Sequence, residues 1–167
     1  MGGRLVITDR TERIVTAHWG PLYLPLFLDS ATLDALEVVD REEGALIRRY
    51  PDGITVVALV PELPLAPLPA GLRDKTAEMF GRHAPGVLGV ATVIAGRGFF
   101  PSLIRSIVSG AAMMSRTRVP QKTFAEAESA IEWAAQLPRQ RPEIAGERSA
   151  IVEAVRAMAA DHGAELR

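Results

Sequence analysis

The segment 94–110, IAGRGFFPSLIRSIVSG, holds the residues of this chain that are best suited to binding chemistry. Two glycines flank Arg97, and two phenylalanines and Pro101 precede an apolar stretch with helical spacing. The start of a helix presents free backbone N–H groups and the positive end of the helix dipole, which together favour an anion. The pattern therefore predicts a helix start that could hold a carboxylate or a phosphate.

Basic side chains strengthen this hypothesis, because one precedes the predicted helix and another lies one turn inside it. The candidate residues for ligand or anion binding are Arg97, Gly98, Phe99, Phe100, Ser102 and Arg105. Each has a structural alternative. The glycines could serve a tight turn, Arg105 could pair with an acid on another helix, and the phenylalanines could close one end of the core instead of stacking on a ligand.

Other kinds of site are not predicted. GRGFFPS begins like a dinucleotide-binding fingerprint, but Pro101 replaces its third glycine. The chain has no cysteine, which excludes disulfides, thiolate metal sites and cysteine nucleophiles. Its three histidines are far apart in the sequence, and no G-x-S-x-G elbow surrounds Ser102. We therefore expect no metal, no cofactor and no enzymatic activity.

Charge is distributed unevenly although the formal net charge is only −1. The segment 79–125 contains no Asp or Glu, whereas the segment 29–43 is rich in acids. The basic residues of the first segment are Arg82, Arg97, Arg105, Arg116, Arg118 and Lys122. Either this segment is acid-poor because it is buried, or a basic face meets an acidic face on a partner or a second copy.

Size and composition indicate one soluble domain. The chain has 167 residues, of which 48% are hydrophobic and 23% charged. No apolar run reaches the roughly 18 residues of a membrane span, and the first residues do not form a signal peptide. Aromatic residues make up only 5%, too few for a stacking surface for nucleic acid. We expect a cytoplasmic protein without nucleic-acid partners.

The hydrophobic patterns predict an alternation of strands and helices. Strands are expected at 5–8, 13–19, 54–60, 87–95 and 121–124, and helices at 30–50, 69–83, 100–116, 125–137 and 148–163. Pro21 and Pro25 argue against a regular element at 20–28, which we expect to be a covered connection. Asp29 or Ser30 is expected to cap the first helix, and Thr123 with Glu126 to form a capping box.

This order resembles the STAS domain, the SpoIIAA-like fold of anti-sigma-factor antagonists. The resemblance covers about residues 4–137 and rests on a hairpin leading to a helix, on VLGVATVIA followed by GRGFF, and on VPQKTF followed by AEAESAIEWAAQL. The resemblance implies a phosphorylated serine or threonine at the start of the second helix. Here that position falls in PELPLAPLPAGL, which has neither residue, so this switch is not expected.

The sequence thus predicts a single α/β domain with a mostly parallel, four- to five-stranded central sheet flanked by helices. The STAS-like part is expected at 1–137, a linker at 138–147 and an added amphipathic helix at 148–163. The proline-rich loop 61–69 has polyproline spacing, but its leucines indicate a loop laid over the core.

Two functions follow as hypotheses. The first is a non-enzymatic regulatory or protein-interaction module, homodimeric, which uses the third helix, the acidic first helix or the tail helix as its interface. The alternative is a carrier or sensor of a small apolar, lipid-like or anionic ligand. Its pocket would lie near 19–28, 61–69 and 96–105.

Overall fold

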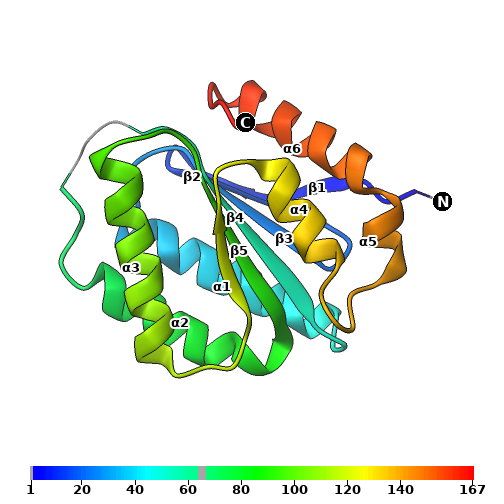
Figure 1. Ribbon diagram of the computed structural model, residues 1–167, viewed down its shortest axis with the longest axis horizontal. Coiled ribbons are helices and arrows are strands. Elements are labelled where there is room, and N and C mark those ends of the chain that lie inside the picture. Colours follow the sequence, from blue (N-terminus) through cyan, green and yellow to red (C-terminus); the bar gives the residue numbers. More distant parts are fainter. Residues whose placement is uncertain (1, 64–66) are drawn as a thin grey trace.

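One six-stranded sheet separates two layers of helices in the computed structural model, which describes residues 2–63 and 67–167 (Figure 1). The strands lie in chain order across the sheet: β1 Leu5–Arg10, β2 Ile14–Trp19, β3 Leu22–Phe27, β4 Ile54–Val60, β5 Val87–Ile94 and β6 Gln121–Phe124. The first three strands form an antiparallel meander, and β3 to β6 are parallel. The α/β class and the mostly parallel sheet are confirmed, with six strands instead of four or five.

The helices divide into two groups of three. One face carries α1 Leu33–Arg49, α2 Leu72–His83 and α3 Phe99–Ser115, and the other carries α4 Ala127–Ala135, α5 Pro142–Gly146 and α6 Arg148–Asp161 (Figure 1). A short 3₁₀ turn, Ala84–Gly86, leads from α2 into β5. The three parallel connections cross over the sheet through α1, α2 and α3 on one face, and α4 to α6, which follow the last strand, cover the other face.

The strand β3 corrects the expectation of an irregular connection at 20–28. Pro25 lies inside this strand, opposite Thr16 of β2. On its other side, β3 pairs with β4 at Tyr23–Val56 and again at Leu26–Leu59, with no pair at Pro25. The pairing with β4 is therefore interrupted at Pro25, where proline has no N–H to donate, and the strand tolerates this residue.

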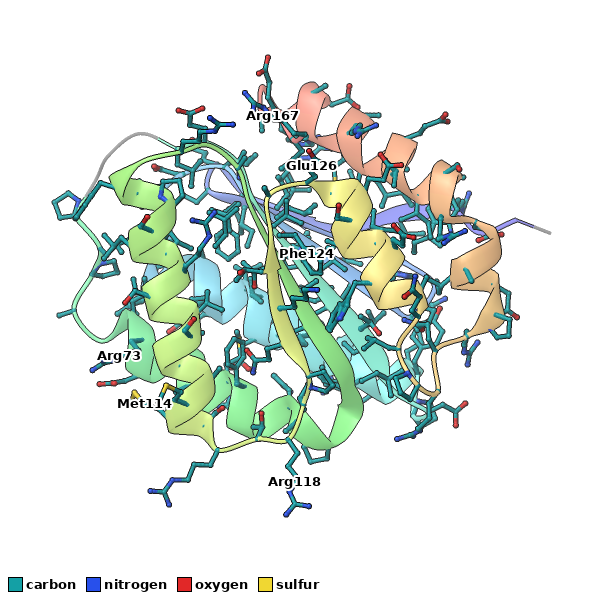
Figure 2. All side chains as sticks on the ribbon, in the orientation of Figure 1. Arg73, Met114, Arg118, Phe124, Glu126 and Arg167 are labelled. Carbon is teal, nitrogen blue, oxygen red and sulfur yellow. The ribbon has the colours of Figure 1, made fainter. Side chains whose placement is uncertain are left out.

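Two helix caps also differ from the sequence-based expectations. Thr32, not Asp29 or Ser30, caps α1, and its side chain accepts a hydrogen bond of 3.2 Å from the Ala35 N–H. The expected capping box before α4 is absent, because Glu126 is itself the N-cap residue and makes no side-chain capping bond. The backbone oxygen of Arg167 instead accepts a 2.7 Å hydrogen bond from the N–H of Ala127, which brings the chain end beside Glu126 (Figure 2).

The tail helix α6 packs on its own domain. Ile151, Val155 and Met158 are buried in the core cluster that β2 and β3 share with α4. At the start of α6, Glu147 accepts hydrogen bonds of 2.7 Å from Trp19 Nε1 and from the Gly3 N–H. The hydrogen bond from Trp19, and secondarily the one from Gly3, lower the pKa of Glu147. The short helix α5 occupies part of the expected linker at 138–147.

Among the residues that the structure describes, no helix is both long enough and apolar enough to cross a bilayer.

Candidate ligand pocket

The pocket begins with a row of small residues across the middle of the sheet. Ala58 of β4 pairs with Thr92 of β5, and the pairs Tyr23–Val56 and Leu26–Leu59 place Pro25 of β3 level with Ala58. Side chains two residues apart on a strand share a face, so this row faces α1, α2 and α3. Ala58 is only half-buried although its strand is central. The small side chains therefore leave space above the sheet.

A cavity of about 90 Å³ occupies this space. The helix α3 lines it with one face, formed by Phe100, Ile104, Ile107 and Val108 at helical spacing. The remaining lining residues come from the other two helices of this face, the sheet and the loops before α1 and α2. They are Pro25, Phe27, Ala31, Leu36, Val39, Glu43, Val56, Ala58, Val60, Leu63, Leu72, Thr76, Met79, Phe80, Val90 and Thr92. An apolar cavity of roughly 150 Å³ holds benzene, so this smaller cavity suits a short, narrow alkyl chain rather than a ring.

The position of α3 explains why the cavity is not filled by the core. This helix packs closely along α2, where Gly110 allows contact: a Cβ added there would lie 3.0 Å from Cδ of Arg73. Figure 2 labels Arg73 of α2 and Met114 of α3 in this region. Only four of the residues of α3 are buried, and its sheet-facing side borders the cavity. The helix thus forms a roof over the small-residue row.

Glu43 is the one charged residue among the residues that line the cavity. Its side chain projects from α1, is 5% exposed and makes no ion pair or side-chain hydrogen bond with the described residues. Burial in apolar surroundings, and secondarily the negative charge of Asp40, raise the pKa of Glu43 to about 8. At neutral pH the carboxyl is therefore mainly protonated, and it can both donate and accept a hydrogen bond.

Two cations of α2, His83 and Arg82, are paired with Asp40. His83 Nε2 lies 2.6 Å from one oxygen of Asp40, and Arg82 is bonded to the other. Burial opposes ionisation of Asp40, but the hydrogen bonds with His83 and Arg82 outweigh it and lower the pKa of this carboxyl. Arg82 is also bonded to Glu78. This arrangement keeps Asp40 ionised and leaves Glu43 without a cation.

A second, much smaller cavity of about 10 Å³ lies on the other side of Glu43. It is lined by residues of α2, β5 and β6, among them Gln121. The side-chain oxygen of Gln121 is buried and has no hydrogen-bond partner among the described residues. Glu43 and this unpartnered amide oxygen therefore line the same small cavity.

The candidate residues of the basic corner do not form one cluster. Phe100 is buried in the pocket roof, whereas Phe99 is 74% exposed on the outside of α3. Arg97 is exposed, and the hydroxyl of Ser102 donates a 3.0 Å hydrogen bond to the carbonyl of Gly98. The positive φ of 104° at Gly98 shows that this glycine serves the turn before the helix.

Two further observations bear on the predicted anion binding at this corner. Neither Arg97 nor Arg105 forms an ion pair within the described part of the chain. An acid lies close by, because a Cβ added at Gly96 would be 3.4 Å from the Glu62 carboxyl carbon. Anion binding here stays a prediction. In the residues described, no group of three or more His, Asp or Glu side chains is arranged to hold a metal ion.

The segments that were expected to enclose a pocket all contribute to the cavity. They supply Pro25 and Phe27 from 19–28, Leu63 from 61–69, and Phe100 and Ile104 from 96–105. Within the proline-rich loop, Pro64 and Leu65 lie outside the described residues.

Sequence reasoning missed Glu43. The signal was present, since Leu36, Val39 and Leu46 form the buried stripe of α1 and position 43 continues it at helical spacing. An acid in an apolar stripe indicates a buried carboxyl.

A solved structure with a similar arrangement comes from an uncharacterised protein of Shewanella loihica PV-4. It is described as a member of the DUF3478 family with a SpoIIAA-like fold. The similarity has a TM-score of 0.46 and 18% sequence identity, and it covers 79% of this chain and 93% of that chain. That description agrees with the STAS-like fold expected from the element order. No protein-family model matches the chain, and no curated protein matches it.

Proposed function

We propose that this protein binds a small, mainly apolar molecule in the cavity between the sheet and α3, and that it acts as a carrier or sensor of this molecule. The observation that carries the proposal is the half-buried Ala58 at the centre of the sheet, beneath a helix whose apolar face borders the cavity. A well-packed core leaves few voids of this size, so an occupant would supply the missing contacts.

The lining favours binding over catalysis. Its polar side chains are Glu43, Thr76 and Thr92. The hydroxyl of Thr76 is engaged by its own helix, because it donates a 2.7 Å hydrogen bond to the carbonyl of Leu72. Within the described residues, the cavity therefore offers no nucleophile beside a ready general base. We accordingly propose no enzymatic activity.

A role as a regulatory or interaction module is the second candidate, and the outer surface of α3 supports it. Phe99, Met113 and Met114 are 74%, 80% and 48% exposed on this helix. Flexible methionines are common on surfaces that bind partner proteins. Because the opposite side of the same helix roofs the cavity, a ligand that shifts α3 would also change this surface.

The cavity is tested by filling it. We expect 1-hexanol to shift the methyl NMR signals of Ile104, Ile107 and Val108, since its alkyl chain replaces empty space beside them. The variant Ala58→Leu should weaken this binding at least about tenfold, equivalent to about 1.4 kcal/mol, because the added carbons occupy the cavity.

The matched control is Ala150→Leu, which makes the same change at an exposed position of α6 and should leave hexanol binding unchanged. Absence of shifts at the pocket methyls, or equal affinity in Ala58→Leu and the wild type, would contradict the proposed function.

A further inference from the structure

Glu43 makes the cavity chemically asymmetric. The pocket is lined by apolar side chains along α3 and the sheet, and its one ionisable group lies on α1, where the small second cavity begins. Glu43 is only 5% exposed, and its carboxyl has no hydrogen-bond or ion-pair partner among the described residues. Burying a carboxyl without a partner is costly, so a group that pairs with it gains affinity.

The charges around Glu43 decide which partner is favoured. Asp40 lies on the same helix, and the cations that face this region from α2 are His83 and Arg82, both bonded to Asp40. The nearby Tyr23 of β3 uses its hydroxyl to donate a 3.2 Å hydrogen bond to the carbonyl of Val39. From β6 the facing group is the uncharged amide of Gln121. Arg48, also on α1, lies beside His83 near Gly44 and forms no ion pair within the described residues. It is not bonded to Glu43, and the charge that shifts the pKa of Glu43, in addition to burial, is the negative one of Asp40.

We infer that the cavity selects molecules with an apolar body and a single amine head group, which the Glu43 carboxylate binds as an ammonium ion. This inference rests on the proposed function, since it concerns the occupant of the same cavity. A carboxylate head group would add a negative charge beside Glu43 and Asp40 and is disfavoured. An alcohol can pair with the protonated acid, but a charge-assisted hydrogen bond is roughly twice as strong as a neutral one.

The proton balance of binding is specific. An alkylamine enters from neutral solution as R–NH₃⁺, and Glu43 gives up its carboxylic proton to the solvent. The complex then contains one ammonium and one carboxylate, and no covalent bond changes. The hydroxyl of Thr92, which also lines the cavity, can accept a further hydrogen bond from the ammonium group. Binding of an amine thus releases one proton per molecule, whereas binding of an alcohol releases none.

The experiment compares hexylamine, 1-hexanol and hexanoate by isothermal titration calorimetry at pH 6.5, in buffers of different ionisation enthalpy. For the wild type we expect hexylamine to bind at least about tenfold more tightly than hexanoate, with release of close to one proton. In Glu43→Gln, amine affinity should fall at least about tenfold and proton release should disappear, while hexanol affinity stays within about threefold. The matched control, Glu37→Gln on the exposed side of α1, should behave as the wild type.

The outcomes separate the two proposals. If hexanol binds but the amine has no advantage over hexanoate, or keeps its affinity in Glu43→Gln, the amine inference is overturned and the binding cavity stands. If no hexyl compound binds the wild type, the proposed function is overturned, and the inference falls with it.

Discussion

Glu43 is the residue in which the sequence pattern and the chemistry disagree. Its position belongs to the buried stripe of α1, but its side chain carries a carboxyl group. Folding removes that group from water without a cation to compensate it, which raises its pKa to about 8. A residue that reduces stability at neutral pH is typical of functional sites, where stability is exchanged for binding.

The pH dependence of stability follows from this shift. Between the ordinary pKa of 4.5 and the folded value of about 8, the folded state binds more protons than the unfolded state. The contribution of Glu43 to stability is therefore fully present below pH 4.5 and is lost as the pH rises through 8. We expect Glu43→Gln to raise the free energy of unfolding by roughly 3–5 kcal/mol at pH 8 and by little at pH 4.

Urea denaturation at the two pH values measures this difference, with Glu37→Gln as the exposed control. Equal effects of Glu43→Gln at pH 4 and pH 8 would show that the carboxyl is not buried in its neutral form.

At the scale of elements, α3 and α6 use their apolar faces differently. The stripe of α6 is buried in the core, whereas that of α3 borders a cavity. Both helices have similar amphipathic patterns in the sequence, because periodicity reports which side is apolar and not what covers it. Figure 1 shows them on opposite faces of the sheet.

The packing of α6 within its own domain has a direct test. Ile151 is fully buried, so Ile151→Ala should lower the free energy of unfolding by about 2–4 kcal/mol through lost contacts and the cavity it creates. Thermal or urea denaturation measures this effect, with Ser149→Ala on the exposed side of α6 as the control. A loss of stability that depended on protein concentration would indicate that α6 packs on a second chain instead.

At the scale of the whole molecule, the fold places a ligand cavity and an exposed apolar surface on opposite sides of one helix. The surface residues Phe99 and Met113 lie on α3 outside the cavity. Near its end, Arg116 and Arg118 add positive charge, and Figure 2 shows Arg118 pointing away from the fold. The molecule thereby has the cavity and the exposed apolar surface on which the proposed ligand-responsive interaction would depend.

If this surface mediates self-association, Phe99→Ser with Met113→Ser should weaken it at least about tenfold, because apolar contact area is lost. Analytical ultracentrifugation measures the association, and hexanol binding to the cavity should be unchanged. Sedimentation of the wild type as a monomer at all concentrations would contradict the homodimer hypothesis.

The sequence alone determined the order of elements apart from β3 and α5, and it determined the apolar sides of the helices. Period-2 and helical spacing are local properties, so strands such as 54–60 and the tail helix could be recognised within single segments. The strand around Pro25 was missed for a tertiary reason, since only pairing with β2 and β4 shows that its absent N–H is not needed. Composition also excluded cysteine chemistry without reference to the structure.

Only the tertiary structure decided where ligand chemistry could take place. The small residues Pro25, Ala58 and Thr92 lie far apart in the sequence and become one row through strand register. The sequence directed attention to GRGFF, whose phenylalanines the fold then separates, Phe100 inward and Phe99 outward. Glu43 became a site residue only because α1, α2 and the sheet enclose it, and burial is a property of neighbours that no single segment contains.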